Sequence, residues 1–98
     1  LRSNDLLGRL GGEEFGILLP DTDTSGGLEF AERLRQRAAH EVIVTEAGEV
    51  TVTLSIGITP FTPHDQHTDV ILARADRALY RAKDLGRNLV ELEPPPEA

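Results

Sequence analysis

Apolar residues gather into two short runs near the start of the chain. Leu6–Leu10 and Phe15–Leu19 are nearly continuous in apolar side chains, and a polar stretch that begins with two glycines separates them. A Gly-Gly pair between two β-like runs is a hairpin signal. Runs without polar alternation are typical of strands that are buried on both faces. We therefore predict a hairpin of two buried strands.

Farther along, two segments repeat their apolar residues at the spacing of an α-helix. The first helix is predicted over residues 26–38, with Thr24 or Ser25 as its cap. The second is predicted to run to about Leu85, with Thr68 or Asp69 as its cap, and Gly86 is well placed to end it in a left-handed conformation. Their apolar stripes consist of Phe30, Ala31, Leu34 and Ala38, and of Leu72, Ala75, Leu79 and Ala82.

Three further segments have the pattern of β-strands. Residues 42–44 form a short β-branched run, and residues 89–92 form a final strand. Between them, residues 50–59 alternate apolar and polar side chains until Pro60 breaks the pattern, which predicts a single strand with one buried face. The order of the elements predicts an α+β fold, with a largely antiparallel sheet and helices packed on it.

The chain is short and acidic. It has 98 residues, a net charge of −7 and no cysteine, which limits it to one small domain. We assign residues 1–92 to this domain and expect residues 93–98, with three consecutive prolines, to be a disordered tail. The charge argues against nucleic acid as a partner, because binding it requires a basic face. The lack of cysteine excludes disulfides, thiolate zinc sites and cysteine nucleophiles.

Membrane segments are not visible in this stretch. No apolar run approaches the ~18 residues that a membrane span needs, and no signal peptide is present. We therefore expect a cytoplasmic domain without direct membrane contact, although segments upstream of Leu1 could anchor the parent protein.

The polar stretch between the first two runs carries the candidate chemistry. Glu13 and Glu14 are adjacent carboxylates at a turn, where a hard divalent cation is the obvious ligand. Gly11 and Gly12 precede them and allow the backbone to approach a ligand closely, because no Cβ intervenes. A turn of this kind suits a nucleoside triphosphate with Mg²⁺.

This stretch resembles the signature of the GGDEF family, the diguanylate cyclases, in its GGEEF variant. The resemblance extends over residues 2–92 and corresponds to the C-terminal half of the family's domain. The family's first strand, with its own metal-binding Asp, and the helical segment that holds guanine and ribose have no counterpart in this chain. The resemblance implies a fragment of a ferredoxin-like fold, related to nucleotide cyclases and polymerase palms. Four further stretches agree with the family in order: residues 2–5, 53–57, 74–80 and 82–88.

The resemblance implies a diguanylate cyclase that joins two GTP into cyclic di-GMP and releases two diphosphates across a homodimer. Glu13 would be a catalytic metal ligand that could help to activate the attacking 3′-hydroxyl, and Glu14 would be the second ligand. The metal would be Mg²⁺ or Mn²⁺. Gly11 and Gly12 would lie against the bound GTP.

Two cations follow near the end of the second predicted helix. Lys83 is the only lysine of the chain, and Arg87 lies four residues later. Cations at a helix C-terminus are also favourable without any ligand, by roughly 0.3–1 kcal/mol. The resemblance implies that Lys83 and Arg87 bind the triphosphate, the first as a point charge and the second as a fork.

A third set of residues corresponds to the family's product-inhibition site, where cyclic di-GMP binds and blocks turnover. Its members would be Arg2, Asp5 and Arg33. An isolated Arg-x-x-Asp motif is not specific, since surface ion pairs are common. The assignment therefore depends on the position of Arg2 and Asp5 just upstream of the two glycines.

Other polar residues have structural interpretations. We expect Asp76 to anchor the backbone of a helix or loop and Tyr80 to pack against the sheet. His64 and His67 are three residues apart, but a solvated loop is favoured over a zinc site because a third ligand is lacking.

Two alternatives to catalysis stay open at this point. The domain could be an inactive module that senses GTP or cyclic di-GMP, or a structural, dimerising fragment. The isolated 98-residue chain is predicted to be inactive, because it would lack one metal ligand and the guanine-binding segment, and its exposed sheet edge predicts self-association.

Overall fold

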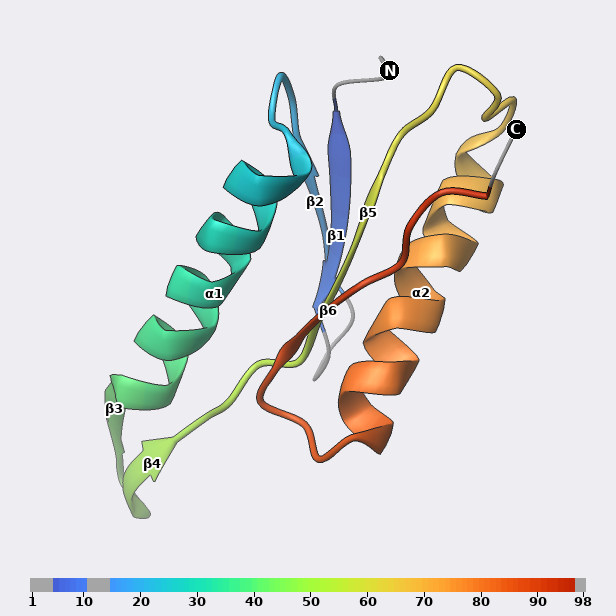
Figure 1. The fold of residues 1–98 in the computed structure, drawn as a ribbon. Coiled ribbons are helices and arrows are strands. Elements are labelled where there is room, and N and C mark those ends of the chain that lie inside the picture. The colour runs from blue at the N-terminus through green and yellow to red at the C-terminus, as the bar shows by residue number, and fades with distance from the viewer. Residues whose placement is uncertain (1–4, 11–14, 97–98) are drawn as a thin grey trace.

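Three layers make up the molecule. The computed structural model describes residues 5–10 and 15–96. A four-stranded sheet lies between two helices, one on each face, and a separate two-stranded hairpin extends from the end of the first helix (Figure 1). The elements are β1 (Leu6–Leu10), β2 (Phe15–Leu19), α1 (Thr24–His40), β3 (Val42–Thr45), β4 (Gly48–Thr51), β5 (Ile56–Pro60), α2 (Thr68–Asp84) and β6 (Val90–Leu92).

The sheet is mixed, in the order β2-β1-β5-β6. The predicted hairpin is present, with Leu10 opposite Phe15 and Leu6 opposite Leu19. The prediction that both strands are buried was wrong for β2, because β2 is an edge strand and Leu18 is 46% exposed. β1 is antiparallel to β5 as well, whereas β5 and β6 are parallel. Two antiparallel pairs and one parallel pair confirm the predicted α+β class with helices packed on the sheet.

Alternate residues of β5 explain why the helices lie on opposite faces. Successive side chains of a strand point to opposite sides of its sheet. A Cβ on Gly27 of α1 would lie 3.0 Å from Cδ1 of Ile58, whereas a Cβ on the preceding strand residue, Gly57, would lie 2.3 Å from the Leu79 nitrogen of α2. Both helices therefore approach the sheet closely, and α2 does so through its backbone.

Each helix closes a separate apolar cluster against the sheet. On the α2 side, Leu7 packs with Phe61, Ile71 and Ala75. The α1 side contains Leu10, Ala31 and Ile56, with partly buried neighbours that include Leu34 and Val90. The predicted stripes of the two helices thus face the core, except that Phe30 on α1 remains 41% exposed.

The first helix begins at Thr24, two residues before its predicted start. Its cap is Asp23, whose carboxylate accepts a hydrogen bond of 2.7 Å from the Gly26 N–H. The prediction of Thr24 or Ser25 as the cap was wrong, because both are already in the first helical turn. A carboxylate is an equally good N-cap acceptor.

The second helix begins at Thr68 with His67 as its N-cap, so the prediction of Thr68 or Asp69 as the cap was wrong. The helix ends as the sequence predicts. Gly86 has a φ of +125°. Its N–H donates to the Lys83 carbonyl at 3.4 Å, and the Arg87 N–H donates to the Ala82 carbonyl at 2.9 Å. These two bonds form a Schellman motif, in which the left-handed residue turns the chain so that the last free carbonyls are satisfied.

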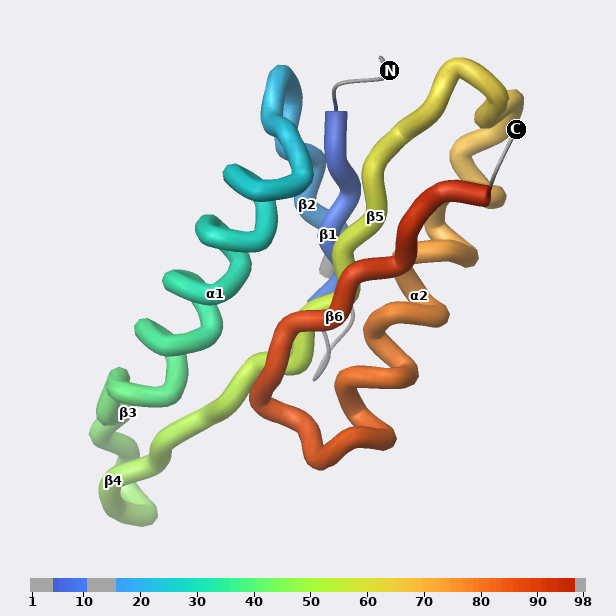
Figure 2. The backbone as a smooth tube through the Cα atoms, viewed as in Figure 1, coloured from blue at the N-terminus to red at the C-terminus, as the bar shows by residue number. Residues whose placement is uncertain are grey.

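Residues 50–59 do not form the single strand that their alternation predicts. β4 pairs only with β3, in a hairpin whose residues are all exposed, whereas β5 belongs to the main sheet. Figure 2 shows how far this hairpin lies from the sheet and how the chain crosses between them over residues 52–55. The same period-two pattern thus serves two strands in two sheets.

Tyr80 also departs from its predicted position. Its side chain is on the outer face of α2 and is 71% exposed, so it does not pack against the sheet. Its neighbours Ala78, Leu79 and Ala82 occupy the buried face instead.

Candidate functional site

One end of the sheet brings together the segments that carry most of the candidate residues. Leu10 is paired with Phe15 of β2 and with Ile56 of β5, and Ile56 is paired in turn with Val90 of β6. Gly11, Gly12, Glu13 and Glu14 lie outside the described residues, but their flanking residues Leu10 and Phe15 are at this end. The loop that leads into Val90 contains Arg87, and it reaches the same end of the sheet.

The two candidate phosphate-binding cations are placed by the end of α2. Lys83 lies in its last turn and is half-buried, whereas Arg87 follows the Schellman motif and is exposed. Arg87 has a φ of +64° and the next residue, Asn88, has a φ of +54°. Few non-glycine residues adopt such left-handed backbone conformations, and asparagine is one of the more tolerant types.

Hydrogen bonds hold this loop from three sides. The Asn88 N–H donates to Oγ of Ser55 at 3.1 Å, and the Ile56 N–H donates to the Leu89 carbonyl at 3.0 Å. From α1, Nη1 of Arg35 donates to the Asn88 side-chain oxygen at 3.0 Å and to its carbonyl at 3.3 Å. The backbone beside Arg87 is therefore fixed by β5, by the chain before it and by the opposite helix.

Arg35 is itself oriented by a neighbour on α1. Its Nε donates to the two carboxylate oxygens of Glu32 at 3.0 and 3.1 Å, and its Nη2 also bonds to Glu32. These hydrogen bonds lower the pKa of Glu32 and raise the pKa of Arg35. The pair therefore stays charged, with one edge of the guanidinium directed at Glu32 and Nη1 left for Asn88.

A second ion pair links the end of β1 to α2. Nε of Arg9, two residues before Gly11, lies 2.8 Å from Oδ1 of Asp76, and the Arg9 side chain is only 18% exposed. We expected Asp76 to anchor backbone, but its carboxylate instead accepts a hydrogen bond from the side chain of Arg9 on β1. No spacing rule connects residues so far apart in the chain.

The two described candidates for the product-inhibition site, Asp5 and Arg33, differ in burial and in their hydrogen-bond or ion-pair partners. Arg2 lies outside the described residues. Asp5 is buried, and its carboxylate accepts a hydrogen bond from the Asp21 N–H at 3.1 Å. Arg33 is on the exposed face of α1, where its guanidinium lies 3.7 Å from Glu29.

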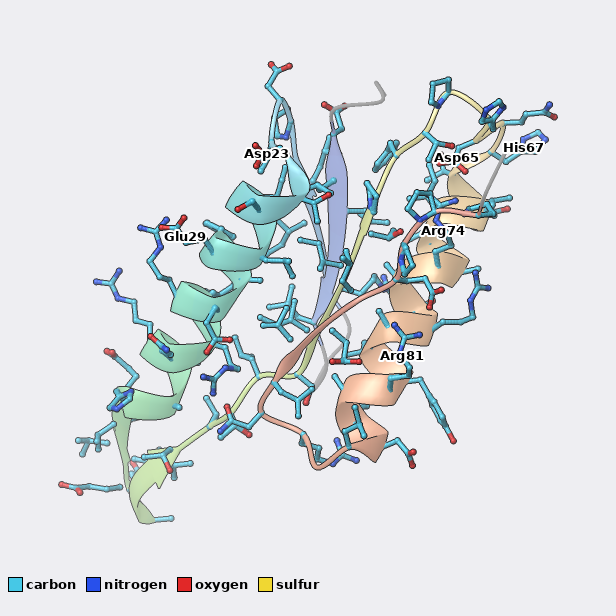
Figure 3. The ribbon with its side chains drawn as sticks, in the orientation of Figure 1. Asp23, Glu29, Asp65, His67, Arg74 and Arg81 are labelled. Atoms are coloured by element: carbon cyan, nitrogen blue, oxygen red, sulfur yellow. The ribbon has the colours of Figure 1, made fainter. Side chains whose placement is uncertain are left out.

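A buried ionic network at the opposite end of the sheet was not predicted. Arg74 is 1% exposed and binds both oxygens of Asp65, at 2.6 and 2.7 Å. It also donates to Oγ1 of Thr59 at 3.1 Å and to the Pro60 carbonyl at 2.6 Å. Figure 3 shows Arg74 and Asp65 directed toward one another at the start of α2. The hydrogen bonds from Arg74 lower the pKa of Asp65, so the network is charged and pins the loop before α2.

The described part of the chain contains no ready metal centre or membrane segment. Among residues 5–10 and 15–96, no three His, Asp or Glu side chains are grouped so that they could hold a metal ion. Within the same ranges, no helix is both long and apolar enough to cross a bilayer.

Comparison with known proteins extends these observations. The family described as "Diguanylate cyclase, GGDEF domain" matches residues 1–89. Diguanylate cyclase DgcP of Pseudomonas aeruginosa is 40% identical over 92 residues, which cover 94% of this chain and 14% of that protein. Probable diguanylate cyclase DgcT of Escherichia coli is 42% identical over 94 residues, covering 92% of this chain and 20% of that protein. The chain spans a quarter or less of the length of such relatives.

Solved structures agree with the fold. The GGDEF domain of DgcB from Caulobacter crescentus, solved in complex with c-di-GMP, superposes with a TM-score of 0.82 at 20% identity, over 91% of this chain and 77% of that one. The active GGEEF domain of a diguanylate cyclase from Vibrio cholerae superposes with a TM-score of 0.74 at 33% identity, over 90% of this chain and 54% of that one. From the family match and these likenesses, the chain belongs to the GGDEF domain family of diguanylate cyclases.

Proposed function

We propose that the protein carrying this chain is a diguanylate cyclase, which condenses two GTP into cyclic di-GMP and two diphosphates. The family match over residues 1–89 carries the proposal. The structure adds that the strands flanking the two glycines, and the loop that bears Arg87, meet at one end of the sheet. That arrangement suits a nucleotide held between a turn and a helix end.

Metal binding in this proposal falls to Glu13 and Glu14. Their oxygen donors are of the type that Mg²⁺ and Mn²⁺ prefer. A bound divalent cation would offset the repulsion between these carboxylates and the triphosphate, and would stabilise the charge on the reacting oxygens.

Four other candidate residues, two glycines and two cations, would bind and orient GTP. Gly11 and Gly12 allow the nucleotide to lie against the backbone. Lys83 and Arg87 would neutralise the triphosphate, and so favour departure of diphosphate when a 3′-oxygen attacks the α-phosphorus in line. Each protomer of a homodimer would hold one GTP, and the attacking oxygen would come from the nucleotide on the partner.

Feedback inhibition by cyclic di-GMP is part of the proposal. Arg2, Asp5 and Arg33 would form the product site, with arginine forks directed at the phosphodiesters or at guanine edges. Arg33 is exposed, and its one described partner, Glu29, is at the long distance of 3.7 Å. A ligand with two phosphodiesters can therefore displace that contact at little cost.

The decisive experiment measures cyclic di-GMP formation from GTP and Mg²⁺ by the complete protein, with Glu13→Ala as control. Product that disappears in the control would support cyclase activity with Glu13 at the metal site. Binding of GTP without product would favour the alternative, an inactive sensor of GTP or cyclic di-GMP. The isolated chain is expected to form no product, because the resemblance assigns one metal ligand and the guanine pocket to segments that it lacks.

A further inference from the structure

The loop after α2 contains two successive residues in the left-handed region, Arg87 and Asn88. Such a backbone conformation persists only where surrounding contacts impose it, and it is often found where a side chain must be presented in a fixed direction. Arg87 is a candidate triphosphate ligand, so the contacts that hold its backbone in this conformation bear on how GTP is bound.

We propose that Arg35 of α1 is a positioning residue for Arg87, holding the loop through Asn88 so that the Arg87 guanidinium is presented to the triphosphate of GTP. The proposal rests on the proposed function. Arg35 lies outside the short motifs on which the resemblance was based, and its contact with Asn88 joins residues 53 positions apart.

Hydrogen-bond geometry supports this role. The same nitrogen of Arg35, Nη1, donates to both oxygens of Asn88, one on the side chain and one on the backbone. Asn88 is held a third time through its own N–H, which donates to Ser55. These bonds fix Asn88, the residue immediately after Arg87. The backbone of Arg87 is fixed on its N-terminal side as well, because its own N–H donates to the Ala82 carbonyl.

The guanidinium that makes these contacts is itself fixed. Its side chain is 19% exposed and is bound to Glu32 through Nε and Nη2. A planar fork held along one edge has little freedom along the other, so Nη1 is directed at Asn88 without a large loss of side-chain entropy. Arg35 therefore acts as a rigid brace between α1 and the loop.

Preorganisation of this kind affects substrate binding more than the chemical step. Arg87 would contact phosphates in both the ground state and the transition state, and loss of such uniform binding raises KM with little change in kcat. Without the brace, the loop can leave the left-handed conformation, and GTP must restore it on binding.

The test compares Arg35→Gln with Arg37→Gln in the complete protein. Both substitutions remove one positive charge from the same helix, but Arg37 is exposed, whereas the hydrogen bonds described between α1 and Asn88 come from Arg35. We expect Arg35→Gln to raise KM for GTP about tenfold, with kcat within about twofold, and Arg37→Gln to leave both near their original values. Arg35→Lys keeps the charge but not the fork, and should show the same direction if Arg35→Gln does not fold.

Hydrogen exchange at the Arg87 and Asn88 amides provides a readout that is independent of GTP. Arg35→Gln should speed exchange at these two amides relative to the rest of α2, and Arg37→Gln should not. Equal KM values in the two variants, an equal fall in kcat and kcat/KM, or unchanged exchange would each overturn the proposal. A parent protein that neither binds nor converts GTP would refute the proposed function, while the exchange data would still decide whether Arg35 braces the loop.

Discussion

Replacing Gly57 by alanine should disrupt the contact between β5 and α2. A Cβ at this position would lie 2.3 Å from both the Ala75 carbonyl oxygen and the Leu79 nitrogen, and 2.9 Å from the Leu79 Cα. All three atoms belong to the backbone of α2, so no side-chain rotation can relieve the overlap. The helix has to move away from the sheet by roughly 1 Å to restore an ordinary contact distance.

The cost of that movement can be estimated from what the helix covers. Ala75, Ala78 and Ala82 are fully buried against the sheet, and Leu79 is 2% exposed. A gap of 0.5–1 Å already forfeits about a quarter to a half of the dispersion energy of each contact. Overpacking of a core generally costs about 1–3 kcal/mol, and a clash with backbone belongs at the upper end. We expect Gly57→Ala to lower the free energy of unfolding by about 3 kcal/mol, a large part of the stability of a small domain.

Gly8 provides a matched control on the neighbouring strand. An alanine there would have its nearest neighbours, two carbonyl oxygens, at 3.9 Å, which is an ordinary contact. Urea unfolding of the domain, followed by circular dichroism, should show a small change for Gly8→Ala and a large one for Gly57→Ala. If the two variants unfold within about 1 kcal/mol of each other, the argument from the close approach of α2 is refuted.

Three further results are expected. Because hydrogen bonds from Arg74 lower the pKa of Asp65 below its ordinary value of 3.8, the pair stabilises the fold fully above pH 3.8, and this contribution is lost as the pH falls through the lower folded-state value. Asp65→Asn should therefore make the urea unfolding midpoint depend less on pH in this acidic range. It should also lower the free energy of unfolding by about 3 kcal/mol at neutral pH, because Arg74 stays buried without its partner; unchanged midpoints would contradict this. Arg33→Ala in the complete protein should weaken inhibition by cyclic di-GMP in initial-rate assays at least about tenfold, and unaltered inhibition would remove Arg33 from the product site. The isolated chain should self-associate in light scattering, because β2 forms an edge of the sheet and the β3–β4 hairpin exposes Ile43 and Val44; a monodisperse monomer would argue against this.

Local patterns predicted the elements whose partners are close in sequence. The hairpin of β1 and β2 follows from two apolar runs joined by glycines, and the end of α2 follows from Gly86. The alternation in residues 50–59 predicted strand structure but not its division, because period two is the same whether a strand pairs with β3 or with β1. Where the chain changes sheets is set by tertiary packing, which alternation does not encode.

The candidate site was predictable to a smaller extent. The roles of Lys83 and Arg87 come from the resemblance to the family and stay predictions, whereas their position at a helix end follows from the pattern around Gly86. The braces formed by Arg35 with Asn88 and by Arg9 with Asp76 were not identified. Each joins elements whose proximity depends on the order of strands in the sheet, so sequence spacing carries no signal for them.

The central place of β5 also has a consequence for the rate of folding. β5 pairs with β1, from which β2, α1, the β3–β4 hairpin and a linking stretch separate it, and it pairs in parallel with β6 across the whole of α2. The local β1–β2 and β3–β4 hairpins can close within microseconds. Pairing of β5 requires long loops to close first, and the chain entropy lost in closing them is not offset until β5 contacts a neighbouring strand. Docking of β5 is therefore the step expected to limit folding, and until it occurs the apolar faces of both helices remain open to other chains.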